Sequence, residues 1–145
     1  MTVTPRYGVD YIADIERLND FASSDRHDWA LAGNGEEAWR VRLRHSVSAL
    51  RDAFFAHVAA SESPGGLYRE VCETSPRLAR RVAELRRDSA RIGSAINLLL
   101  VRSAHARPDW VRRWCADLAA QLTRHREEGA DLLHQAYFSD LGGET

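Results

Sequence analysis

The sequence of 145 residues has no lysine, only two cysteines and four prolines, and no long uninterrupted apolar run. Cys72 and Cys115 lie far apart without a Cys-x-x-Cys spacing, which argues against a disulfide framework and against a zinc finger. No segment approaches the roughly 20 apolar residues of a membrane span, and no early apolar run resembles a signal peptide. We therefore expect no membrane partner and a cytoplasmic location.

The chain also lacks an excess of charge of either sign. The 20 basic residues are all arginines, and with 21 acidic residues the formal net charge is −1. Such a chain has no overall field to attract nucleic acid, so we expect no nucleic-acid partner. Its length favours one domain over residues 1–145, with residues 1–7 as a loose lead-in and 139–145 as a C-terminal tail.

Apolar residues recur at alternating steps of three and four along four segments, the pattern of amphipathic helices. The predicted helices span residues 8–24, 36–62, 75–103 and 108–138. Pro108 suits the first position of its helix, Ser75 before a proline suits a cap, and Asn34 with Glu37 forms a capping-box pattern. No strand alternation is present. The sequence predicts an all-α protein, a four-helix bundle with up-down-up-down topology.

The connections between these helices are mostly short. Residues 23–35 are predicted to form a loop with Trp29 and Leu31 packed on the body, and residues 67–73 to form one or two helical turns. Three tryptophans near helix starts are predicted to pack the ends of the bundle: Trp39, Trp110 and Trp114.

Three of the four apolar stripes are interrupted where a packed seam would carry Leu, Ile, Val or Phe. The interrupting residues are His57 and Ser61, then Ser89, then His125 and Gly129. The two members of each pair are four residues apart, so they lie on one face of their helix. Helical bundles place metal and cofactor sites at such levels. We expect these five residues to line a water-filled or ligand-filled pocket.

The segments around these residues resemble the hemerythrin-like (HHE cation-binding) family of four-helix bundles. They are FFAHVAASESPGGLY (54–68), LARRVAELRRDSARI (78–92) and LTRHREEGADLLHQAYFSDLGG (122–143). The family holds two irons with His-x-x-x-Glu on two helices and further histidines on the others. The resemblance implies that His57 and His125 stand at ligand positions. It also implies that Ser61, Ser89 and Gly129 replace a carboxylate, a histidine and a carboxylate, so we expect no intact di-iron centre.

Three interpretations of His57 and His125 stay open. They are core histidines bonded to each other, to the serines or to water; ligands of one metal ion; or part of a pocket for an organic ligand. Two imidazoles alone bind a first-row metal weakly, so a metal site needs oxygen ligands. Glu128, three residues after His125, is the favoured addition. Glu62 and Asp88 lie one position off their stripes and are weaker candidates.

No phosphate-binding loop, nucleophile elbow or His-Glu-x-x-His motif is present, so no catalytic residue is assigned and a non-enzymatic protein is favoured. The leading hypothesis is a hemerythrin-like bundle whose degenerate core site binds at most one iron or other transition metal ion, or a small ligand. The alternative is a non-catalytic structural or partner-binding bundle that has lost metal binding. A tetrapyrrole-binding bundle with His57 and His125 as axial ligands is a third hypothesis.

Overall fold

The computed structural model describes residues 10–25, 29 and 35–139, and this part of the chain contains helices and no strand. The predicted all-α fold class is therefore confirmed for these residues. Four helices form the body: α1 (Ile12–Ser23), α3 (Gly35–Glu62), α5 (Ala79–Arg102) and α6 (Pro108–His134). A shorter helix, α4 (Leu67–Thr74), fills the connection where helical turns were predicted. No helix of the described ranges combines the length and the apolar character that a bilayer crossing requires.

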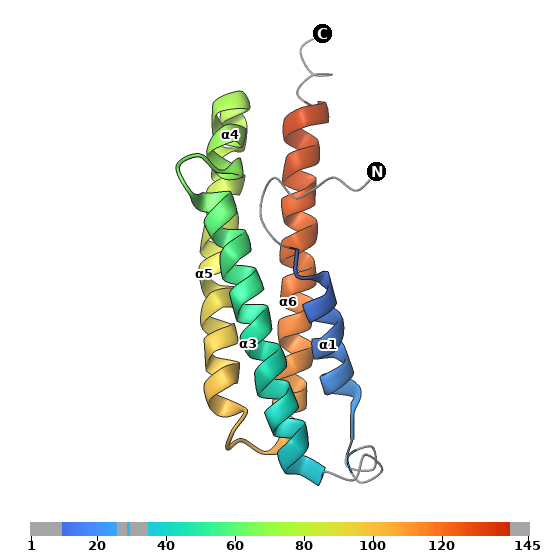
Figure 1. Cartoon of the computed structure of the whole chain (residues 1–145). Helices are drawn as coiled ribbons and strands as arrows, with labels where there is room; N and C mark the ends of the chain where they lie inside the picture. Colours follow the sequence, from blue (N-terminus) through green and yellow to red (C-terminus); the bar gives the residue numbers. More distant parts are fainter. Residues whose placement is uncertain (1–9, 26–28, 30–34, 140–145) are drawn as a thin grey trace.

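The four helices pack around a common core. Helix α1 contacts α3 and α6, and α5 contacts the same two helices from the other side. Successive long helices run in opposite directions (Figure 1). The predicted stripes face inward: Leu50, Leu85 and Leu122 are all buried. Since each stripe repeats with the helical period, burying one face of each helix produces this arrangement.

The helix boundaries differ from the predicted ones at three helix ends. Helix α1 begins at Ile12, because Asp10 and Tyr11, which were predicted to be helical, are not. Ser75 does not cap the third helix, because its side-chain oxygen lies 3.5 Å from the carbonyl oxygen of Ala136 instead. A 3-10 turn, Pro76–Leu78, precedes α5. At the other end of the chain, α6 passes into a π-helical turn, Gln135–Ser139. The predicted cap Asn34, Leu31, the lead-in 1–7 and residues 140–145 of the tail lie outside the described residues.

The tryptophans divide into two groups. Trp29 is buried, as predicted for packing on the body, and its ring centroid lies 4.7 Å from that of Trp39. Trp39 is buried and Trp114 is partly buried against the core, in line with the prediction that they pack the ends of the bundle. The same prediction is wrong for Trp110, which is 49% exposed. Trp110 lies in the first turn of α6.

The apolar core is divided into two clusters along the bundle. The larger cluster joins α1, α3, α5 and α6, and the second joins α4, α5 and α6. On α5, Leu85 belongs to the second cluster and Ile92 to the first, with Ser89 between them. On α6, His125 lies in the same way between Leu122 and Leu132. The interrupted positions therefore share one level, which we call the polar layer.

Helix α1 packs against only part of the length of α3 and α6, and its N-terminal end lies at the level of the polar layer. It has 12 residues, against 28 in α3 and 27 in α6, so at 1.5 Å per residue it spans less than half their length. Tyr11, directly before α1, is fully buried, and its ring centroid lies 5.3 Å from that of His57. The polar layer thus lies where four-helix packing gives way to packing without α1 (Figure 1).

Candidate functional site: the polar layer

His125 of α6 is the centre of the polar layer. It is 2% exposed, and both ring nitrogens have partners on α5. Its Nδ1 lies 2.7 Å from Oδ2 of Asp88, and its Nε2 lies 3.2 Å from Oγ of Ser89. A carboxylate at Nδ1 fixes the orientation of an imidazole and favours the tautomer with a proton on that nitrogen. Two adjacent residues of α5 therefore hold the ring from both ends.

One proton more or less separates two arrangements of this network. The Ser89 hydroxyl lies 2.9 Å from the carbonyl oxygen of Leu85, to which it can donate. If it does so, an imidazolium at His125 donates from Nε2 to Ser89 and from Nδ1 to Asp88. If His125 is neutral, Ser89 donates to Nε2 instead. Rotation of its hydroxyl hydrogen therefore lets Ser89 act as acceptor or as donor toward Nε2.

Tyr68 and Glu62 extend the polar layer toward α4. The sequence analysis did not name Tyr68 and ranked Glu62 as a weaker candidate ligand. The Tyr68 phenol is in hydrogen-bonding reach of Ser89. Burial is the largest of the effects that raise the pKa of Tyr68, to about 12. Burial likewise raises the pKa of Glu62, against the opposing effects of Arg86 and His125. The Tyr68 phenol is therefore a hydrogen-bond donor, and burial makes the Glu62 carboxyl easier to protonate than an exposed one.

His57 of α3 lies beside aromatic rings rather than beside a carboxylate. Its ring centroid is 5.3 Å from that of Tyr11 and 6.5 Å from that of Phe54. The Phe54 ring also contacts His125, with centroids 5.9 Å apart. Burial lowers the pKa of His57, and the positive charge that His125 can carry lowers it further. His57 is thus favoured as a neutral imidazole.

Three buried oxygen atoms of the layer have no hydrogen-bond partner among the described residues. They are the Tyr11 hydroxyl, Oγ of Ser61 and Oε2 of Glu62. Tyr11 and Ser61 are almost completely buried. A buried polar atom without a partner costs about 1–3 kcal/mol. Water or a polar ligand that meets these atoms would remove that cost.

The structure gives each predicted site residue a different surrounding. Ser89 and His125 are in contact, and Ser61 is buried one helical turn from His57. Gly129 is half-buried, and a Cβ atom built on it would meet nothing within 4 Å. The carboxylate that contacts His125 is that of Asp88, although the sequence analysis ranked Glu128 above it. The predicted five-residue pocket stays a prediction.

A metal site can be tested against the donors that are present. Both nitrogens of His125 already have protein partners. Residues 10–25, 29 and 35–139 contain no group of three or more His, Cys, Asp or Glu side chains placed to hold a metal ion. A di-iron centre does not fit this donor set. The one-metal ligand set His57, His125 and Glu128 stays a prediction.

The contacts Asp88–His125–Ser89 follow the order of a hydrolase triad, but their chemistry differs. Ser89 is 4% exposed and lies in the middle of a helix, where the backbone amides around it are used within α5. No such amide is left to stabilise an oxyanion. The arrangement positions hydrogen-bond donors, and Ser89 lacks the surroundings of an acyl-transfer nucleophile.

The lowered pKa of His57 predicts a pH dependence of stability. Unfolding returns this group to its ordinary pKa of 6.5, so the unfolded chain binds more protons just below that pH. We expect the free energy of unfolding to fall as the pH is lowered from about 7 toward the folded pKa, by at most about 1.4 kcal/mol per pH unit for one proton. Denaturant unfolding at a series of pH values measures it.

The variant His57→Gln isolates this contribution. Glu62 acts with the opposite sign, because its raised pKa makes stability fall as the pH rises above 4.5. Subtracting the free energy of unfolding of His57→Gln from that of the wild type at each pH cancels the Glu62 contribution. The difference should retain the dependence on pH that His57 produces. Equal slopes in the two proteins would contradict the prediction.

Comparison with known proteins finds no family model, no curated protein and no solved structure that matches this chain. The resemblance to the hemerythrin-like family therefore stays a prediction from the sequence.

Proposed function

We propose that the chain is a hemerythrin-like, up-down-up-down four-helix bundle whose degenerate core site binds a small polar ligand, or at most one transition metal ion, in the polar layer. The observation that carries the proposal is the set of unpartnered, buried hydroxyls of Tyr11 and Ser61 beside His57. Native proteins rarely leave such atoms unsatisfied, so a group that accepts or donates hydrogen bonds belongs beside them.

The contacts of His125 favour a polar ligand over a metal ion. A metal at Nε2 would have to displace Ser89, which lies 3.2 Å from that nitrogen. A polar ligand leaves the Asp88–His125–Ser89 contacts in place and uses the free hydroxyls instead. The neutral imidazole favoured at His57 has one donor and one acceptor nitrogen, which suits an uncharged molecule with both donor and acceptor groups.

A second candidate, a structural bundle that binds nothing in its core, is favoured by one observation. Both nitrogens of His125 are satisfied by protein groups, so this residue needs no ligand. Under this candidate, ordinary water meets the remaining hydroxyls.

Elemental analysis with native mass spectrometry separates the candidates on protein purified without chelators. The proposal expects a bound small molecule, or at most one equivalent of metal. Reconstitution with ferrous iron and oxygen should give no oxo-bridged charge-transfer bands in the near ultraviolet. Such a pair of bands would overturn the proposal, and a protein with neither ligand nor metal would favour the structural candidate.

Gly129→Ala tests the state of the site by stability. Because a Cβ atom there meets nothing within 4 Å, we expect the ligand-free protein to gain about 1 kcal/mol of unfolding free energy from helix propensity. Gly93→Ala is the matched control on α5, where the added Cβ would lie 3.0 Å from the Phe55 ring. Its gain should be smaller. If a ligand approaches the α6 backbone, Gly129→Ala should instead weaken ligand binding.

A further inference from the structure

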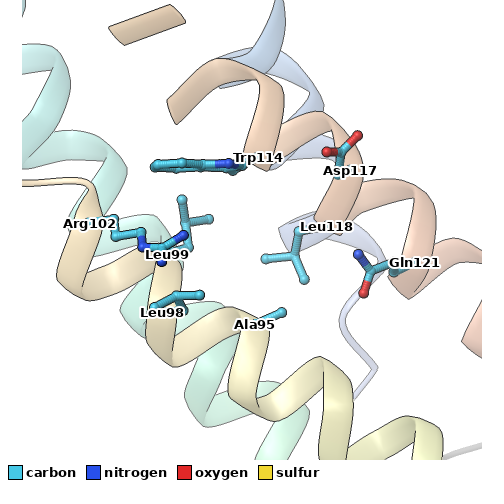
Figure 2. A pocket seen from close by; sticks show the side chains of 8 residues that line it. All are labelled: Ala95, Leu98, Leu99, Arg102, Trp114, Asp117, Leu118 and Gln121. Carbon is cyan, nitrogen blue, oxygen red and sulfur yellow. The ribbon is translucent and has the colours of Figure 1, made fainter. Parts of the chain in front are cut away.

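An apolar groove lies on the outer face of α5 and α6, away from the polar layer. Figure 2 shows Leu98 and Leu99 of α5 facing Leu118 of α6, with the Trp114 ring across one end. The cavity measures about 150 Å³. A cavity of about this size can accept a benzene ring, so it can accept one apolar side chain.

Apolar side chains also protrude beside the groove. Val101, three residues after Leu98, is 71% exposed, and Trp110, stacked against Trp114 at 6.3 Å between ring centroids, is 49% exposed. The same face thus carries both a cavity and protruding groups. A small molecule in the cavity would leave Val101 and Trp110 in water, whereas a protein surface would cover both.

The two rims of the groove carry opposite charges. Arg102 lies on the α5 rim, with its guanidinium 5.2 Å from the centroid of the Trp114 ring, and Asp117 lies on the α6 rim (Figure 2). A two-fold axis along the helices would lay α5 of one copy over α6 of another. That operation brings the α5 rim of each copy, with Arg102, toward the α6 rim of its partner, with Asp117.

We propose that this α5–α6 face is the interface of a symmetric homodimer. A two-fold interface uses one patch twice and therefore has to be complementary to itself. This face has both features: Val101 and Trp110 protrude beside the cavity, and the rim with Arg102 is positive where the rim with Asp117 is negative. Tryptophan and arginine, which this face combines, are the residues that most often dominate binding energy at interfaces.

Analytical ultracentrifugation of the full chain over a range of concentrations tests the proposal. We expect a monomer–dimer equilibrium that Val101→Glu weakens on the order of tenfold or more. Val41→Glu is the matched control, because Val41 is 41% exposed on α3, outside this face, and its variant should dimerise like wild type. A wild type that stays monomeric, or equal weakening by both variants, would overturn the proposal.

Charge reversal tests the symmetry directly. Arg102→Glu and Asp117→Arg should each weaken their own homodimer, because each places like charges across the axis. A mixture of the two variants should form a heterodimer, since each copy then meets opposite charges at both rims. Far-ultraviolet circular dichroism checks that both variants fold. Absence of the heterodimer from a mixture of folded variants would overturn the two-fold arrangement. If the face instead binds a different protein or a small molecule, the wild type and all variants should be monomeric, which would overturn the homodimer.

Discussion

Replacing His125 by alanine should lower the free energy of unfolding by about 3 kcal/mol. The change removes a buried ring, and buried large-to-small substitutions cost about 2–5 kcal/mol through the cavity that remains. It also removes a hydrogen-bond partner from Ser89 and from Asp88. Asp88 is 20% exposed, so water can replace part of its lost contact. Urea unfolding followed by circular dichroism measures the change.

His134→Ala on the same helix is the matched control. His134 is exposed, and its ring stacks only on Phe138 in the described part of the chain, so its loss should cost less than about 1 kcal/mol. The double variant His125→Leu with Ser89→Ala tests the polar contacts separately from the volume. The double variant leaves no unpartnered hydroxyl at Ser89 and a smaller cavity than His125→Ala, and the Asp88 carboxylate that still loses its partner is 20% exposed to water. It should therefore cost less than His125→Ala. A cost of His125→Ala no greater than that of His134→Ala would show that the network does not support the fold.

The level of the polar layer could be predicted from the sequence because the stripes fix both the inward face and the position along each helix. Antiparallel helices with short connections then bring Ser61, Ser89 and His125 to the same height. The same periodicity predicted the burial of Leu50, Leu85 and Leu122. These features depend only on the 3.6-residue period and on chain direction.

The partners of His125 could not be predicted in the same way. Asp88 is one position off its stripe, and only the packing of α5 on α6 shows that its carboxylate reaches Nδ1. Tyr68 lies on the short helix α4, whose placement depends on the connection before it rather than on a long stripe. Ser75 had the sequence of a cap, yet its hydroxyl faces the carbonyl oxygen of Ala136. Side-chain reach and tertiary contacts decide these cases.

Arg40 connects α3 to the turn between α5 and α6, and the sequence analysis did not single it out. It is 8% exposed. Its two terminal nitrogens donate to the carbonyl oxygens of Ser103 at 2.8 Å and Ala106 at 2.7 Å, and its Nε lies 3.2 Å from Oε2 of Glu36. The two carbonyls follow the end of α5, where helical partners are lacking. One guanidinium therefore satisfies them both.

Arg40→Met should lower the free energy of unfolding by about 3 kcal/mol, because hydrogen bonds to a charged group contribute about 1.5–3 kcal/mol each and Ser103 is fully buried. Arg40→Lys should recover only part of the loss, since one ammonium group does not reproduce the fixed geometry of two guanidinium nitrogens. Arg44→Met, one turn further along α3 and exposed, is the matched control and should cost less than about 1 kcal/mol. Denaturant unfolding of the three variants measures the series.

Because the turn that Arg40 holds lies between Val101 and Trp110, loosening this turn should also weaken any self-association through the α5–α6 face. Equal stability of Arg40→Met and Arg44→Met would show that Arg40 does not hold the turn in solution.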